Sequence, residues 1–335
     1  MSSGNCTPRQ TLPDVSVSAN AKINSLFAEL DLVARSMIPV LIQGETGTGK
    51  ELVANYIHGK SDRSRGPFVA INCAGIDVTF AESILFGHKK GAFTGAVADK
   101  QGACEMASGG TLFLDELNEL KMDVQAKLLR ALENHVIFRL GDVNPIFVDF
   151  RLISATGVPL ENLLAENKLR PDMVYRLQGY KAVLPPLRER KEDMPVIMNT
   201  ILAGIPGKQV HYTNDVLAAC LREEWVGNIR QLRRVLELAA CFASYGTIAL
   251  GHFQKALENQ SIQPTAPTKD QGRLQSRADV ERIREILASA DPSSSIKEKV
   301  ELAAARLGMS TQTVYRRISE QRLTPKGLVA ELAAT

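Results

Sequence analysis

The stretch Gly44-Glu45-Thr46-Gly47-Thr48-Gly49-Lys50 decides the fold. It follows a short apolar run of β type, Pro39–Gln43, and precedes a segment with helical patterning. In this strand–loop–helix setting, glycines let backbone N–H groups turn towards a phosphate, and the helix presents its positive end to the same group. Lys50 can reach the terminal phosphates of a nucleotide. The stretch therefore predicts a nucleotide-binding loop.

The residue after this loop, Glu51, stands where Ser or Thr normally binds magnesium. Thr48, water or another carboxylate would then have to complete the coordination of Mg²⁺. Two carboxylates follow a second apolar strand, Gly110–Leu114. Asp115 is placed to hold Mg²⁺, and Glu116 to polarise an attacking water. Together with the loop, this pair predicts hydrolysis of ATP, because simple nucleotide binding needs no water-polarising acid.

Short apolar strands and helical segments alternate around these two motifs. The strands that we expect are Phe68–Ile71, Thr111–Leu114 and Arg151–Ala155, and the helices are Ala19–Ser36, Phe80–Phe86 and Val124–Glu133. This alternation predicts an α/β domain with a largely parallel sheet. The turn signals within Val136–Asp149 indicate an inserted hairpin.

The character of the chain changes after Pro185-Pro186. Residues 190–257 show helical patterns only, residues 259–276 are polar with two prolines, and residues 278–335 are helical again. We therefore predict a flexible tail (1–16), an α/β ATPase domain (17–186), a helical lid domain (187–258), a linker (259–277) and a C-terminal helical domain (278–335).

Composition excludes several classes of protein. With 335 residues, 44% hydrophobic and 23% charged, the chain is typical of soluble globular proteins. A net charge of +3 gives no bulk sign of nucleic-acid binding, so any such surface must be local. No apolar run approaches the roughly 20 residues of a membrane span. The five widely spaced cysteines argue against a disulfide framework and a zinc site. We expect a cytoplasmic protein with buried thiols.

A second short motif is more specific. Gly91-Ala92-Phe93-Thr94-Gly95-Ala96, preceded by Glu82–Lys90, resembles the signature loop of bacterial enhancer-binding proteins, the AAA+ ATPases that activate sigma-54 RNA polymerase. GETGTGKE, with Glu51, is also similar to that family's phosphate loop. The resemblance implies an AAA+ fold, a hexameric ring, and a loop that ATP hydrolysis moves against the sigma factor. Independently, bracketing glycines allow such a loop to refold, and an exposed Phe93 would need a partner to cover it.

The resemblance implies roles for residues around the nucleotide. Asn72 resembles the family's switch residue, which pairs with Glu116. Thr156 stands at the sensor-one position, where Gly157 replaces the usual following Asn. Arg230 resembles the sensor-two arginine.

Arg170 and Arg176 match the family's two arginine fingers. Such guanidinium groups reach the γ-phosphate of a neighbouring subunit, so they imply a homo-oligomer. Val226 stands where family members usually have Pro, a change that we expect to alter the stiffness of the turn and little else.

The C-terminal region predicts a helix-turn-helix, with Gly308 at the turn and Ser310 capping the second helix. The apolar positions that can pack together are Leu302, Ala303, Leu307, Met309, Val314 and Ile318. The polar positions left for DNA are Thr311, Gln312, Thr313, Arg316 and Arg317. This end is similar to the Fis-type DNA-binding domain of the same family. A helical hairpin without DNA contacts is the alternative.

These features predict an ATP-hydrolysing transcription activator that binds upstream promoter DNA and remodels sigma-54 RNA polymerase. Because only residues 1–16 precede the ATPase domain, we expect control by a separate protein, by expression level or by a similar partner. One rival is a DNA-binding repressor with a vestigial ATPase, against which the intact Lys50, Asp115 and Glu116 argue. Another is a replication-type AAA+ loader, which has no use for the Gly91–Ala96 loop.

Overall fold

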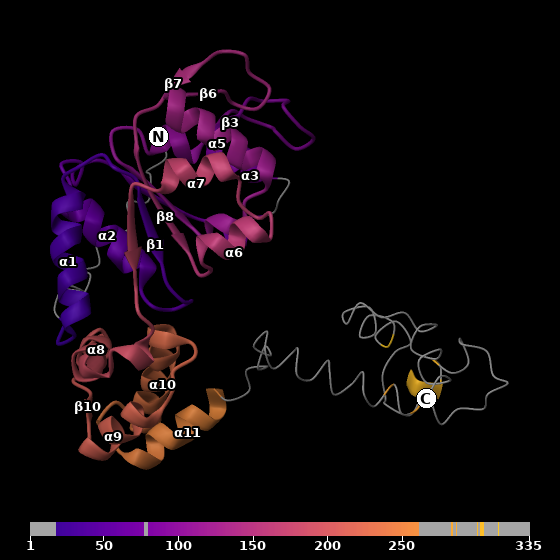
Figure 1. The fold of residues 1–335 in the computed structure, drawn as a ribbon. Helices are drawn as coiled ribbons and strands as arrows, with labels where there is room; N and C mark the ends of the chain where they lie inside the picture. The colour runs from indigo at the N-terminus through magenta and orange to yellow at the C-terminus, as the bar shows by residue number, and fades with distance from the viewer. Residues whose placement is uncertain are drawn as a thin grey trace. The chain divides into compact units, whose positions relative to one another are not determined.

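The computed structural model describes residues 18–76 and 80–260, together with positions 283, 286, 300, 302–304 and 314. The chain divides into two compact units, residues 1–261 and 262–335 (Figure 1). The first unit contains the ATPase domain and the lid. No helix within the described residues is long and apolar enough to cross a membrane.

A five-stranded parallel sheet forms the centre of the first unit, with the strand order β2-β5-β8-β1-β9. Its strands are β1 (Val40–Gln43), β2 (Phe68–Asn72), β5 (Thr111–Asp115), β8 (Arg151–Thr156) and β9 (Tyr180–Val183). The prediction of a parallel sheet is confirmed. Edge strand β9 has no counterpart among the expected strands, and β8 lies between the two strands that carry the nucleotide motifs.

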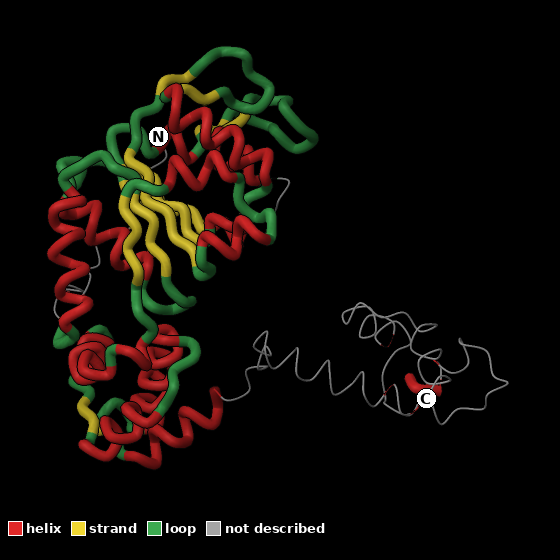
Figure 2. The backbone as a smooth tube through the Cα atoms, viewed as in Figure 1, coloured by secondary structure: helices red, strands yellow, loops and turns green. Residues whose placement is uncertain are grey.

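Helices cover both faces of this sheet (Figures 1 and 2). They are α1 (Ala21–Ala34), α2 (Lys50–Lys60), α3 (Ala81–Phe86), α4 (Ala103–Met106), α5 (Met122–Asn134), α6 (Leu160–Ala165) and α7 (Pro171–Leu177). Alternate residues of β1 point to opposite faces, so Val40 and Ile42 pack with α1 and α2, whereas Leu41 packs with α3, α5 and α7. The result is a three-layer α/β/α domain.

Two short antiparallel pairs extend from this domain. β3 (Gly87–His88) pairs with β4 (Lys100–Gln101), and the pair brackets the Gly91–Ala96 loop. β6 (Val136–Ile137) pairs with β7 (Ile146–Phe147), which confirms the predicted hairpin.

The lid packs around the buried Trp225. Its helices are α8 (Met194–Ala203), α9 (Asn214–Arg222), α10 (Asn228–Phe242) and α11 (Leu250–Gln260). The expectation of helices alone is wrong in one respect, because β10 (His211–Tyr212) and β11 (Thr247–Ile248) form a short parallel pair. Asn259 and Gln260, which we assigned to the linker, complete α11.

Several expectations lie outside the described residues: the tail 1–16, most of the linker, and the DNA-facing side chains Thr311, Gln312, Thr313, Arg316 and Arg317. In the second unit, Ala303 and Val314 are helical and buried, as their place in the expected apolar set requires. Leu302 is 37% exposed and therefore departs from that set.

Candidate functional site

The phosphate loop connects β1 to α2 and closes tightly on itself. Gly47 and Gly49 adopt left-handed φ values of 82° and 101°, which only glycine reaches without strain. The Thr48 hydroxyl donates to the Glu45 carbonyl at 2.8 Å. Gly49 is the N-cap of α2, so the unpaired N–H groups of that helix face the loop. The local sequence thus produces the predicted anion-binding turn.

Lys50 lies inside this turn and is 6% exposed. Its Nζ donates to the Gly44 carbonyl at 3.0 Å and lies 3.4 Å from Glu116 Oε1. Lys50 of the first motif and Glu116 of the second are therefore close together, although they follow different strands of the sheet. β8 separates β1 from β5, but the carboxyl ends of parallel strands meet at one edge.

Asp115 and Glu116 occupy that edge at the end of β5. Burial raises the pKa of Asp115, an effect that Lys50 partly opposes. Asp115 Oδ1 accepts a hydrogen bond from the Glu116 N–H at 3.0 Å. Glu116 itself has φ of 50°, an unusual conformation for a residue with a side chain. Such strained backbone is often found at functional sites.

Asn72 ends β2 and pairs in register with Asp115. The family resemblance implies that the Asn72 side chain pairs with Glu116, but the two side chains do not bond in this structure. Instead, Asn72 Oδ1 accepts a hydrogen bond from the Ala74 N–H at 3.0 Å and caps the 3₁₀ turn η1 (Cys73–Gly75). The cap is local, because a side-chain amide two residues before a free N–H readily forms this bond. In this structure Asn72 is thus near the carboxylates without contacting Glu116.

Thr156 ends β8 at the same edge. Its hydroxyl lies 3.2 Å from Asn118 Oδ1 and donates to the Val158 carbonyl at 3.0 Å. Sequence reasoning missed Asn118, which follows Glu116 by two positions and was masked by the stronger Asp-Glu signal. Beside Thr156, a side chain at Gly157 would begin 3.7 Å from Glu116 Oε2 and 3.8 Å from Thr46 Oγ1. Glycine therefore leaves space next to Glu116, the proposed general base.

The lid contacts the phosphate loop directly. Asn228 Nδ2 donates to Glu45 Oε2 and to the Thr46 carbonyl, both at 3.1 Å. The positive charge of Arg230, on the exposed side of α10, is one of the groups that oppose the raised pKa of Asp115. Val226 is 78% exposed in the turn before α10. The structure thus brings Arg230 close to the carboxylate edge.

An apolar cavity of about 90 Å³ lies beside Gly49, with walls from α1, α2, α8 and α10. Its lining includes Phe27, Ile197 and Ile229. Arg190, 7% exposed, borders it and donates to the Thr48 carbonyl at 2.8 Å. Sequence reasoning did not find this cavity, because its walls come from distant segments.

These residues suit ATP and Mg²⁺. The loop and Lys50 offer donors and positive charge to phosphates, and the cavity offers apolar walls to a base. Burial raises the pKa of Asp115, and a bound cation would oppose this effect by stabilising the charged carboxylate. The Thr48 hydroxyl donates to Glu45, and Glu51 is exposed on α2, so Asp115 is the stronger candidate to hold the metal.

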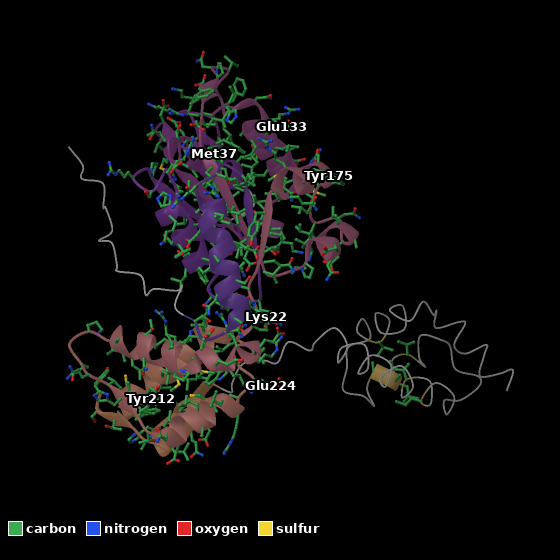
Figure 3. All side chains as sticks on the ribbon, turned by 60° about the vertical axis from the view of Figure 1, so that its left-hand side comes forward. Lys22, Met37, Glu133, Tyr175, Tyr212 and Glu224 are labelled. Atoms are coloured by element: carbon green, nitrogen blue, oxygen red, sulfur yellow. The ribbon has the colours of Figure 1, made fainter. Side chains whose placement is uncertain are left out.

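Arg170 and Arg176 lie at the two ends of α7. Arg170 forms a double hydrogen bond with Asp172, and Arg176 donates to the Leu132 carbonyl at 2.7 Å. Tyr175 between them is 80% exposed (Figure 3). Among the described contacts, neither guanidinium group bonds to the phosphate loop of its own chain. The structure thus leaves both arginines on an exposed part of the domain.

The Gly91–Ala96 loop is closed by backbone bonds at its base. The Gly91 N–H donates to the Ala96 carbonyl at 2.8 Å, and Gly91 and Gly95 have φ of 83° and 104°. Phe93 is partly covered by its own chain. Its ring is half-buried, with ring centroids 5.0 Å from His88 and 5.9 Å from Phe80. Thr94 remains exposed.

The β6–β7 hairpin supports this loop from one side. The Lys89 N–H donates to the Leu140 carbonyl at 2.9 Å, and a Cβ at Gly141 would lie 2.9 Å from Ala92 Cβ. The hairpin also exposes Phe138, Val143 and Phe147. Loop and hairpin therefore form one surface with exposed apolar side chains.

Three cysteines, Cys73, Cys104 and Cys220, are buried, and burial raises the pKa of each thiol to about 12. They are inert in this environment. Cys241 is exposed, contrary to the expectation, and Cys6 lies outside the described residues.

Two protein-family models match the domains that carry this site. Residues 16–182 match the sigma-54 interaction domain, and residues 188–270 match an AAA+ ATPase lid domain. The DNA-binding transcriptional regulator NtrC of Klebsiella pneumoniae is 41% identical over 253 residues, which cover 74% of this chain and 53% of that protein. The Nif-specific regulatory protein of Azotobacter vinelandii is 38% identical over 297 residues, or 88% of this chain and 56% of that protein. The chain spans about half the length of these relatives.

A solved structure has the same fold. The crystal structure of NtrX from Brucella abortus in complex with ATP matches with a TM-score of 0.64 and 28% identity, covering 91% of this chain and 68% of that one. The structure with ADP matches equally well. With the phosphate loop and the two carboxylates in place, residues 16–182 form a sigma-54 interaction domain, which is an AAA+ ATPase domain, and an AAA+ ATPase lid domain follows it.

Proposed function

We propose that this protein is a transcription activator that hydrolyses ATP to remodel sigma-54 RNA polymerase in the cytoplasm. The observation that carries the proposal is one compact unit that holds both the hydrolytic edge with Asp115 and Glu116 and the Gly91–Ala96 loop, in which Thr94 is exposed. Lys50 and Glu116 meet at that edge at 3.4 Å. A vestigial ATPase or a helicase loader would not need both features.

In the proposed reaction, the loop from Gly44 to Lys50 binds the phosphates of ATP, and the apolar cavity beside Gly49 receives its adenine ring. Asp115 would hold Mg²⁺, which neutralises charge on the phosphates. Glu116 takes a proton from water as the water oxygen attacks the γ-phosphorus and the β–γ bridging bond breaks. Thr156 and Asn118 hold the adjoining strand end in place, and Arg230 stabilises the phosphates from the lid.

Nucleotide binding would change the contacts of Glu116. Phosphates compete for Lys50, which frees Glu116 from its present ion pair. β2 ends at Asn72, beside Asp115, and leads through η1 towards α3 and the Gly91–Ala96 loop. We infer that this route carries the nucleotide state to the loop, where Phe93 and Thr94 contact sigma-54.

Assembly into a hexameric ring completes the proposed site. Arg170 and Arg176 lie away from their own phosphate loop, so each could reach the γ-phosphate of a neighbour. Substituting either by Ala should depress hydrolysis, and mixing that variant with Lys50→Ala subunits should restore part of it. Absence of rescue in rings proven to contain both variants would exclude fingers that act in trans.

DNA binding is assigned to residues 278–335, with Thr311, Gln312, Thr313, Arg316 and Arg317 facing the DNA. This domain would hold the ring near a promoter, and a separate regulatory protein could control it. Deleting the domain should abolish site-specific DNA binding and leave hydrolysis intact. A truncated protein that still recognised a specific site would overturn the assignment.

Transcription in vitro tests the whole proposal. With sigma-54 polymerase, a promoter and ATP, the wild-type protein should open the promoter complex. Thr94→Ala should retain ATP hydrolysis and lose opening, because Thr94 is exposed and lies outside the nucleotide site. Asn144→Ala, in the neighbouring hairpin turn, is the matched surface control. Normal opening by Thr94→Ala would contradict the proposed role of the loop.

A further inference from the structure

Asn228 is the first residue of the lid helix α10, at the end of that helix that contacts the phosphate loop. It has no exposed surface, and its φ is 52°, in the left-handed region where Asn is tolerated better than most residues. A fully buried polar side chain in such a conformation needs compensating hydrogen bonds. Asn228 has them on both ends of its amide.

The partners of Asn228 come from two distant segments. Oδ1 accepts a hydrogen bond from the Leu187 N–H at 2.8 Å, in the segment that joins β9 to the lid. Nδ2 donates to Glu45 Oε2 and to the Thr46 carbonyl, both at 3.1 Å. One side chain therefore joins α10, the connecting segment and the phosphate loop.

These partners require an amide. The Leu187 N–H can only donate and the Thr46 carbonyl can only accept, which settles the orientation of the amide. An aspartate would keep the bond to Leu187, lose both donors and place a negative charge against Glu45. Alanine would leave the buried Leu187 N–H without this partner and would remove the donor to the Thr46 carbonyl.

The surrounding backbone leaves little room for adjustment. A Cβ at Gly47 would lie 2.4 Å from the Gly227 carbonyl oxygen and 3.0 Å from Arg230 Cβ. The loop thus rests directly on the turn before α10. Arg230 lies two positions after Asn228 in the same helix. The hydrogen bonds of the Asn228 amide therefore help to determine the distance between Arg230 and the phosphate loop.

We propose that Asn228 is a positioning residue that holds the lid on the phosphate loop and thereby places Arg230 over the phosphates of ATP. The proposal rests on the sensor-two role of Arg230 in the proposed function. It adds a residue that acts through Arg230 and never touches the nucleotide.

A double-mutant cycle in the full chain tests this. We expect Asn228→Ala to raise KM for ATP about tenfold, with a smaller change in kcat, since the hydrogen bonds to Leu187, Glu45 and Thr46 are lost. In an Arg230→Ala background the same substitution should change KM less than twofold, because coupled residues are not additive. Arg188→Ala, which removes another partner of Glu45, is the control and should leave KM nearly unchanged.

Each outcome has one meaning. Additive effects of Asn228→Ala and Arg230→Ala would overturn the positioning role while leaving Arg230 in place. A wild-type KM for Arg230→Ala would instead refute the sensor-two role in the proposed function. Thermal unfolding checks the fold of every variant. Should Asn228→Ala unfold, Asn228→Asp, which keeps the bond to Leu187, replaces it in the cycle, and a wild-type KM for Asn228→Asp would overturn the proposal.

Discussion

Two glycine loops of this protein use the same backbone conformation in opposite surroundings. Gly47 and Gly49 in the phosphate loop have φ of 82° and 101°, and Gly91 and Gly95 in the second loop have φ of 83° and 104°. A Cβ at Gly47 would lie 2.4 Å from the Gly227 carbonyl oxygen. A Cβ at Gly91 or Gly95 would meet nothing within 4 Å.

The difference separates two uses of glycine. At the phosphate loop, glycine permits close packing, so the loop is held by β1, α2 and the lid at once. At the Gly91–Ala96 loop, glycine permits only the turn. The loop is held by the ring contacts of Phe93, by the approach of Gly141 to Ala92, and by the backbone hydrogen bond between Gly91 and Ala96. A loop with few contacts opens at lower free-energy cost. The first loop is suited to fixed chemistry and the second to movement.

The largest effect should come from the carboxylate edge beside the phosphate loop, where Glu116 follows β5. Glu116→Gln removes the base and should lower kcat for ATP hydrolysis about 10²–10⁴-fold, the range for general base catalysis. ATP binding should persist, because Lys50 then loses a competing carboxylate. Steady-state hydrolysis and equilibrium binding of ATP measure the two effects. A variant with wild-type kcat would show that Glu116 is not the base.

Lys50→Ala should weaken ATP binding about 100-fold, because a buried ammonium–phosphate contact is lost. Equilibrium titration with ATP measures it. Lys90→Ala, at the base of the second loop, is the matched control and should bind ATP normally. An equal loss of ATP affinity in both variants would show that the two loops do not differ in nucleotide binding.

Adding a methyl side chain at one glycine of each loop tests the comparison itself. Gly47→Ala should abolish ATP binding and lower the melting temperature, because a Cβ meets backbone at 2.4 Å. Gly95→Ala should cost only about 1–2 kcal/mol for its left-handed conformation and leave ATP binding intact. Thermal unfolding and ATP titration of the pair provide the measurement. Similar behaviour of both variants would mean that crowding does not distinguish the loops.

Phe93→Ala should lower the free energy of unfolding by about 1–2 kcal/mol, because the half-buried ring loses its contacts with Phe80 and His88. Urea unfolding measures it, with Thr94→Ala as the exposed control that should unfold like wild type. A loss as large as that of a core residue, about 3–5 kcal/mol, would show that the loop is held more firmly than its contacts indicate.

Arg188→Ala should have the smallest effect, about 0.5 kcal/mol, since Arg188 and Glu45 are 39% and 41% exposed and water screens the pair. Arg188 lowers the pKa of Glu45, with Asn228 adding to this effect. A lowered folded pKa stabilises the fold above the unfolded value of 4.5 and ceases to do so as pH falls through the folded value. The difference in unfolding free energy between wild type and Arg188→Ala should therefore vanish in acid. A difference that persists there would assign the effect to packing.

The sequence alone was sufficient for the hydrolytic edge. The glycine loop is a local motif, and Asp115 and Glu116 directly follow an apolar strand. Because the carboxyl ends of parallel strands meet at one edge, the approach of Lys50 to Glu116 follows from the pattern.

Only the tertiary structure decided the contacts between distant segments. The short strand β9 and the buried role of Asn228 carry no local periodicity, so no pattern indicates them. Asn72 bonds to the nearest free N–H, a choice that depends on how the chain turns after β2. Phe93 is half-buried because Phe80 and His88 fold beside it, and composition does not reveal which neighbours a ring will meet. Local motifs specify chemistry, whereas burial and partners depend on packing that the whole chain determines.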